Sequence, residues 1–175
     1  NPSGVAIQTG AMPLVEVYQR ARDADAQAAF GSVVVFNRTI DAATAAEIMQ
    51  TIVEGVAAPG FDDDALAAFN DFDRFKRNKE IRVMKLPDFA TLPKYVGDVT
   101  DVLEAKVFDD GSIVLATPYL SRVRATADLA NASAEHKSVG RVEVTRPATE
   151  RELDDLLFAW YVNIHVRSNG CVIAR

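Results

Sequence analysis

Short β-branched runs alternate with helical patterns along the first half of the chain, and this alternation restricts the fold more than any other feature. Residues 32–36 read Ser-Val-Val-Val-Phe, a continuous apolar run that predicts a strand buried on both faces. Apolar residues recur at helical spacing at 13–22 before this run and at 41–55 after it. Pro13 suits the start of the first helix, and Asp41 suits the N-cap of the second. Alternating strands and helices predict a layered α/β domain.

Further segments add strands, helices and a hairpin to this pattern. The turn sequence Asp109-Asp110-Gly111 separates two apolar runs and predicts a β-hairpin over 102–117. Helices are expected after the aspartates at 62–64 and after the capping box Thr149-Glu150-Arg151-Glu152, with the latter helix ending at 168–170. The region 122–140 is polar and Ala-rich and predicts a surface connection. Shorter apolar runs are expected to be strands, at 4–7, 56–58, 81–86, 142–144 and 172–174. The sheet is therefore expected to be mixed.

Size and charge narrow the class of protein. The 175 residues fit about one domain, and a formal charge of -6 does not favour binding to nucleic acid or anionic membrane. The longest apolar run covers residues 156–162, far less than the ~18 residues of a membrane span. The single cysteine, Cys171, excludes an intrachain disulfide and fits a reducing compartment. We therefore expect a cytoplasmic protein.

The sequence lacks the common motifs of zinc sites and of catalytic nucleophiles. His136 and His165 stand apart from each other and from Cys171, so we expect no zinc site. His165 is interpreted as a helix-face residue rather than a general base. Cys171 is interpreted as an inert core thiol rather than a nucleophile. The basic cluster at 74–79 can bind phosphate, but it is more typical of a solvated face.

Two positions have both a structural and a ligand-binding interpretation. Asn169 precedes Gly170 after the last expected helix, where an Asn-Gly pair can end the helix with left-handed backbone geometry. Its carboxamide can equally face a ligand from the end of an element. Gly31 can relieve a tight turn, or it can let a ligand approach the backbone closely.

Four segments, in order along the chain, resemble one enzyme family. They are Asn-Pro-Ser-Gly at 1–4, DADAQAAFGSVVVFNR at 23–38, VAAPGF at 56–61 and DLLFAWYVNIHVRSNG at 155–170. The family is the AICAR transformylase (phosphoribosylaminoimidazolecarboxamide formyltransferase) part of the bifunctional purine-biosynthesis enzyme, whose other part is an IMP cyclohydrolase. Residues 71–140 match the family poorly.

The resemblance implies a fold, a reaction and an assembly. The fold would be a three-layer α/β/α arrangement, cytidine-deaminase-like but without the zinc site. The reaction would transfer a formyl group from the co-substrate 10-formyltetrahydrofolate to the 5-amino group of AICAR. Active sites of the family lie between subunits, so a homodimer is expected, with AICAR and folate as small-molecule partners.

The family's substrate-contacting positions fall on three residues of this chain. Asn169 would hold the AICAR carboxamide and orient the amine, so it is also the candidate catalytic residue. Gly31 would bring its backbone close to the nucleotide. Glu54, expected at the end of the second helix, would supply an acidic contact where some relatives carry Asp.

The chain also departs from the family pattern. The catalytic Lys-His pair stands just before the position of Asn1, and an arginine-bearing G-x-G-Q-x-S-R segment follows the position of Arg175. We therefore interpret residues 1–175 as the central part of the transformylase domain, within its first subdomain, and expect this piece alone to be inactive. The usual D-P-x-S-A-F-G-G is D-A-Q-A-A-F-G-S here, at 25–32. The alternative is a non-catalytic nucleotide-binding or assembly module on the same scaffold.

Overall fold

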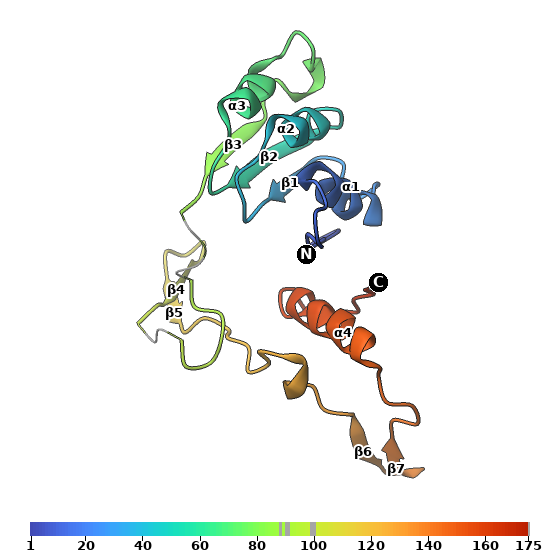
Figure 1. Ribbon diagram of the computed structural model, residues 1–175. Helices are drawn as coiled ribbons and strands as arrows, with labels where there is room; N and C mark the ends of the chain where they lie inside the picture. Colours follow the sequence, from blue (N-terminus) through green and yellow to red (C-terminus); the bar gives the residue numbers. More distant parts are fainter. Residues whose placement is uncertain (88, 90–91, 99–100, 175) are drawn as a thin grey trace. The chain divides into compact units, whose positions relative to one another are not determined.

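The computed structural model divides the chain into two compact units, residues 1–91 and 92–175 (Figure 1). It describes residues 1–87, 89, 92–98 and 101–174. The two units are described separately below.

The first unit is an α/β structure, as the alternating pattern predicts. Its three strands form one sheet in the order β1-β2-β3, and both strand pairs are parallel. Helices and strands follow one another along the chain: α1 (Leu14–Ala24), β1 (Ser32–Val35), α2 (Ala42–Ile48), β2 (Val53–Ala58), α3 (Asp63–Asn70), a 3-10 turn (Lys76–Asn78) and β3 (Arg82–Lys85).

The core of the first unit lies on one face of this sheet. Val34 pairs with Val56 in the register of β1 and β2, and both pack into a cluster with side chains from all three helices. Tyr18 of α1, Ile48 of α2 and Phe69 of α3 are buried in that cluster. Figure 1 shows α2 and α3 against the sheet.

On the opposite face of the sheet, the larger side chains of the two outer strands are exposed within this unit, whereas Ala57 of the central strand is 3% exposed. Val33 and Val35 are 58% and 61% exposed, and Met84 on β3 is 43% exposed. The prediction that residues 32–36 are buried on both faces is therefore wrong for this unit. A run of β-branched residues has the same sequence whether one or both faces are covered, so only the packing distinguishes the two cases.

Three features of the first unit also differ from the sequence predictions. Residues 4–7 form no strand. The second helix stops at Ile48, and β2 begins at Val53, so the helix does not continue to Gly55. The sheet is parallel rather than mixed, because the predicted hairpin forms a sheet of its own. Asp41 caps α2 as predicted, accepting a hydrogen bond from the Thr44 N–H at 2.8 Å.

A buried asparagine holds the connection between α2 and β2. The Asn78 side-chain oxygen accepts from the Val53 N–H at 3.0 Å, while its amide donates to the carbonyls of Met49 and Thr51 at 3.0 and 2.7 Å. Asn78 is 2% exposed, so these three bonds satisfy backbone groups that water does not reach.

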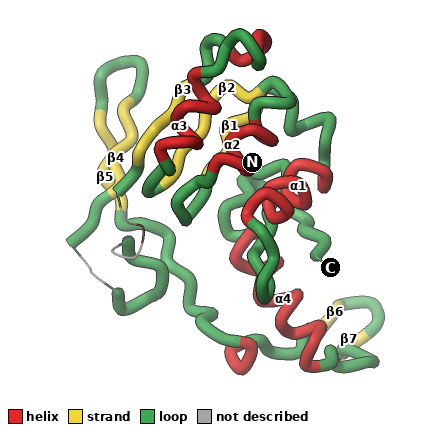
Figure 2. The backbone as a smooth tube through the Cα atoms, turned by 45° about the horizontal axis from the view of Figure 1, so that its top comes forward, coloured by secondary structure: helices red, strands yellow, loops and turns green. Residues whose placement is uncertain are grey.

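The second unit consists of short elements separated by loops (Figure 2). Strands β4 (Glu104–Val107) and β5 (Ile113–Ala116) form the predicted hairpin, with Gly111 in the left-handed region at φ +82°. A second hairpin, β6 (Ser133–His136) with β7 (Gly140–Glu143), and a 3-10 turn (Thr126–Asp128) lie in the region expected to be mostly a polar connection. Residues 172–174 form no strand.

Helix α4 (Glu150–Asn163) begins at the predicted capping box. The Glu152 N–H donates to the Thr149 hydroxyl at 3.3 Å, and the Thr149 N–H donates to the Glu152 carboxylate at 2.8 Å. The helix ends at Asn163, earlier than predicted. Tyr161 on its last turn donates to the Arg124 carbonyl at 3.0 Å and contacts the Tyr95 hydroxyl at 3.1 Å. Burial, with the Tyr95 contact, raises the pKa of Tyr161 to about 12.

Candidate functional site

Gly31 and Glu54 are brought together by the pairing of β1 with β2. The Gly31 N–H donates to the Ile52 carbonyl at 2.9 Å, which fixes the entry into β1 beside the entry into β2. A Cβ atom placed on Gly31 would lie 3.7 Å from Oε1 of Glu54. Two of the three predicted site residues are therefore neighbours, although many residues separate them in the sequence.

The backbone at Gly31 requires glycine on conformational grounds. Its φ is +70°, a left-handed conformation that residues with a Cβ adopt at a cost of roughly 1 kcal/mol. The space around the missing side chain is open, since Glu54 is the only neighbour within 4 Å among the described residues. Both interpretations of Gly31 thus have support: the turn needs glycine, and the backbone can be approached.

Glu54 occupies a strand rather than a helix end. It is the second residue of β2, and it is the exposed residue in a strand that is otherwise buried. Glu54 and Gly31 both lie at the end of the parallel sheet where its strands begin. Ligands of open α/β sheets usually bind at the carboxyl edge, so fold analogy alone would not have found this pair.

Phe30 was not singled out by the sequence analysis, yet it stands beside this pair. Phe30 is 68% exposed, although it stands close to the start of a strand of the sheet. The Phe-Gly dipeptide at the entry to β1 is the signal that could have drawn attention to it.

Asn169 belongs to the second unit, in the exposed loop after α4. The left-handed residue of this loop is Ser168, with φ 65°, so neither Asn169 nor Gly170 ends the helix in the predicted way. Gly170 has a different role. A Cβ there would lie 2.6 Å from Oδ1 of Asn163 and 2.7 Å from Cγ1 of Val166, so a side chain at this position would require both neighbours to shift. The Asn169 side chain is left exposed.

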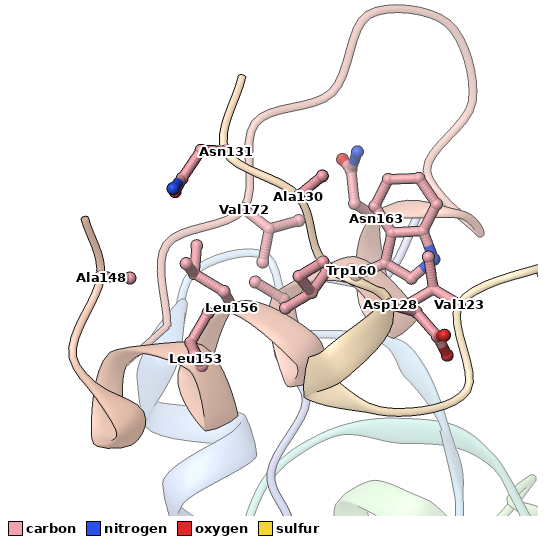
Figure 3. Close-up of a pocket in the computed structure, with 12 residues that line it drawn as sticks. Val123, Asp128, Ala130, Asn131, Ala148, Leu153, Leu156, Trp160, Asn163 and Val172 are labelled. Atoms are coloured by element: carbon pink, nitrogen blue, oxygen red, sulfur yellow. The ribbon is translucent and has the colours of Figure 1, made fainter. Parts of the chain in front are cut away.

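A cavity of about 510 Å³ lies beside α4 in the second unit (Figure 3). Its wall is largely apolar, with Leu153, Leu156 and Trp160 on the helix side and Val172 on the loop. Asp128 is its charged residue. That carboxylate accepts hydrogen bonds from the backbone N–H groups of Arg124 and Ala125, which hold its pKa below the usual value. Asn169 does not line this cavity.

The remaining candidate side chains gather into no site. His165 is exposed, in the turn that follows α4. Cys171 is also exposed and lies outside any strand, so the prediction of a core thiol is wrong. Across the described residues, no group of three or more His, Cys, Asp or Glu side chains is placed to hold a metal ion. No helix in that part of the chain is long and apolar enough to cross a membrane.

Comparison with known proteins decides the family. The family described as the AICARFT/IMPCHase bienzyme matches residues 1–175, the whole chain. The chain belongs to this family.

Curated relatives from the same family match the chain over almost its whole length. The bifunctional purine biosynthesis protein PurH of Magnetococcus marinus is 34% identical over an alignment of 177 positions, which covers 100% of this chain. The PurH of a Nostoc species is 36% identical over 99% of the chain, and that of Dictyostelium discoideum is 28% identical over 100%. The chain spans about 28% of the length of these bacterial relatives and 29% of the Dictyostelium protein.

Proposed function

We propose that the protein carrying this chain acts in purine biosynthesis as a formyltransferase. It would transfer the formyl group of 10-formyltetrahydrofolate to the 5-amino group of AICAR. The observation that carries this proposal is the proximity of Gly31 and Glu54 where the strands of the sheet begin, in a chain that belongs to the bienzyme family along its whole length.

The reaction makes specific demands on the residues around the amine. The amine nitrogen forms a bond to the formyl carbon, and the bond from that carbon to N10 of the folate breaks. A proton leaves the amine, and N10 gains one. Since the amine is a weak, delocalised nucleophile, its placement against the formyl carbon contributes much of the rate.

Each predicted residue has a chemical task in this scheme. The exposed Glu54 carboxylate would accept hydrogen bonds from donor groups of AICAR. Gly31, with no side chain over its backbone, would let the nucleotide lie against the turn. Asn169 would bind the carboxamide through matching donor and acceptor atoms, which orients the amine.

The proposal extends to the fold of the complete domain. The open sheet face around Val33 and Val35 would be covered in the full-length protein, giving the three-layer, cytidine-deaminase-like arrangement. Covering it would remove apolar surface from water at about 25 cal/mol per Å².

The test uses the full-length protein and three variants. Glu54→Gln keeps the shape of the side chain but removes its charge, and a bond to a charged group contributes about 1.5–3 kcal/mol. We expect kcat/KM for AICAR to fall roughly 10- to 100-fold, the kinetic equivalent of that energy. Asn169→Ala should lower kcat at least as much. Glu80→Gln, another exposed carboxylate of the first unit, serves as the matched control and should leave both constants unchanged.

The outcomes separate the possible functions. Loss of activity in Glu54→Gln and Asn169→Ala, with unchanged circular dichroism, supports the proposed site. If the unsubstituted full-length protein and both variants are equally active, the roles proposed for Glu54 and Asn169 are wrong. If the unsubstituted protein binds AICAR but forms no product, the non-catalytic module is favoured instead.

A further inference from the structure

The loop after α4 contains the one Asn-Gly dipeptide of the chain, Asn169-Gly170. An asparagine side chain can react with the backbone nitrogen of the next residue, because that nitrogen and the side-chain carbonyl carbon can close a small ring. A side chain on the next residue hinders this ring closure, and glycine has none. Of all the asparagines in the sequence, Asn169 is therefore the one most prone to lose its amide group.

Both reacting groups are accessible in the structure. Asn169 and Gly170 are exposed, and they lie outside any helix or strand. Within the described part of the chain, the Gly170 N–H donates no hydrogen bond and the Asn169 carboxamide has no polar partner. The hydrogen bonds of a helix or strand would hold the backbone against ring closure, whereas an exposed loop rearranges at little cost in free energy. No hydrogen bond among the described residues therefore opposes the reaction.

Packing favours the same glycine that makes Asn169 reactive. A Cβ on Gly170 would lie 2.6 Å from Oδ1 of Asn163 and 2.7 Å from Cγ1 of Val166. Contacts this short would require the neighbours to shift, so the loop passes the end of α4 most easily with glycine at this position. The reactive dipeptide is thus a consequence of how the loop packs on the end of the helix.

Other asparagines of the chain suit the reaction less. Asn78 is 2% exposed and forms three hydrogen bonds. Asn163 is held in the last turn of α4, and its side-chain oxygen is buried. Asn131 lies in an exposed loop, as Asn169 does, but Ala132 follows it. Asn131 therefore has similar surroundings and differs in the Cβ of the next residue.

We propose that Asn169 is a site of spontaneous deamidation, which converts it to aspartate and isoaspartate. A hydroxide ion takes the proton of the Gly170 N–H, and the nitrogen forms a bond to Cγ of Asn169. The bond from Cγ to Nδ2 then breaks, and ammonia leaves after taking a proton from water, which restores the hydroxide. Water opens the resulting succinimide ring at either carbonyl carbon. The net reaction consumes a water molecule and releases ammonia, and it needs no enzyme.

Deamidation changes both the charge and the backbone of the loop. The product side chain is a carboxylate, which is ionised at neutral pH and has no N–H donor. In isoaspartate the main chain runs through Cβ and Cγ, so the backbone before Gly170 is longer and its packing against Asn163 and Val166 must rearrange. A chain in which Asn169 binds the AICAR carboxamide would lose that contact with age. This last consequence rests on the proposed function, whereas the reaction itself does not.

Peptide mapping of the full-length protein by mass spectrometry tests the reaction. The folded protein is kept at mildly alkaline pH in water labelled with heavy oxygen, and it is then digested under acidic conditions that suppress further deamidation. Incorporated heavy oxygen identifies product formed during the incubation. We expect aspartate and isoaspartate to accumulate at Asn169 about tenfold faster than at Asn131, and faster still at higher pH. Equal, slow rates at the two asparagines would overturn the proposal.

Ala132→Gly is the matched variant, since it gives Asn131 the same following residue in an exposed loop. Asn131 should then react about as fast as Asn169. If Asn131 reacts in this variant while Asn169 stays intact, the folded protein protects Asn169 and the proposal is wrong.

The same measurement on urea-unfolded protein gives the rate at Asn169 without any restraint from the fold. We expect the rate in the folded protein to lie within about tenfold of this value, because the loop is exposed and free of hydrogen bonds at the reacting groups. Deamidation that occurs only in the unfolded protein would overturn the proposal.

Discussion

The two units of the chain achieve order in different ways. In the first unit, buried apolar side chains from three helices pack on one face of a parallel sheet. In the second, Ser121 is the only buried residue among those the structure describes, and hydrogen bonds of loops and helix ends connect the elements. The difference shows that short helices and strands along a chain do not by themselves produce a buried core. In the first unit, substitutions in the core should lower the free energy of unfolding much more than substitutions at the surface. In the described part of the second unit, no comparable buried apolar cluster exists.

The largest expected effect comes from the core of the first unit. Phe69 is 2% exposed and meets the Phe61 ring edge-on at 6.0 Å. Phe69→Ala should lower the free energy of unfolding by about 3–5 kcal/mol, because it leaves a cavity that the sheet cannot fill. Ile173→Ala in the second unit, where the side chain is 93% exposed, should change it by less than about 0.5 kcal/mol. Urea unfolding of the two variants measures both values, and similar losses would remove the distinction between the units.

A smaller loss in the free energy of unfolding is expected when the buried polar residue of either unit is replaced. Asn78→Ala would leave the Val53 N–H and two carbonyls without partners, with an expected loss of about 3 kcal/mol. Ser121→Ala removes bonds to Trp160 and Val123 and should cost about 1 kcal/mol. The expected cost is smaller because Trp160 is 38% exposed and Val123 is half-buried, so water can reach these partners although Ser121 itself is buried. Hydrogen exchange at the Val53 amide reports the first change locally. A slower or unchanged exchange rate in Asn78→Ala would show that Asn78 does not hold the entry to β2.

The smallest effect is a pH dependence at the start of α4. The Arg146 guanidinium, then the Thr149 N–H and hydroxyl, lower the pKa of Glu152 from 4.5 to about 2. A lowered pKa means that the ionised form stabilises the fold. This contribution is complete above pH 4.5 and is lost as the pH falls toward 2. Following the Thr149 amide by NMR through an acid titration should show the helix start loosening over that interval. Glu152→Gln should abolish the step, and a step retained in that variant would assign it to another group.

Local signals in the sequence predicted local structure well. The Asp41 cap, the Thr149–Glu152 capping box and the turn at 109–111 are confirmed, because each depends on residues a few positions apart. The family resemblance pointed to Gly31 and Glu54 as separate substrate contacts, and only the structure places them side by side. Phe30 was missed because the Phe-Gly dipeptide marks the entry to β1 but does not indicate that the Phe side chain is exposed.

Structure that depends on distant residues was predicted poorly. Glu54 was expected at a helix end, since apolar spacing continues from α2 into β2 without a break, and only pairing with β1 and β3 makes that segment a strand. The left-handed residue after α4 is Ser168 rather than Asn169, although Asn tolerates that geometry better. The exposed Cys171 shows the same limit, because an apolar run predicts burial only if another element covers it.

The sequence by itself determined the family, the alternation of strands and helices in the first unit, the places where α2 and α4 begin, and the position of the turn in the β4–β5 hairpin. These features follow from caps, turns and apolar spacing that act over a few residues. The tertiary structure alone decided which sheet face is covered, that Gly31 lies beside Glu54, and that Asn78 connects α2 with β2. Those outcomes depend on backbone pairing and burial between segments that the chain must first bring together, and no short stretch of sequence contains that information.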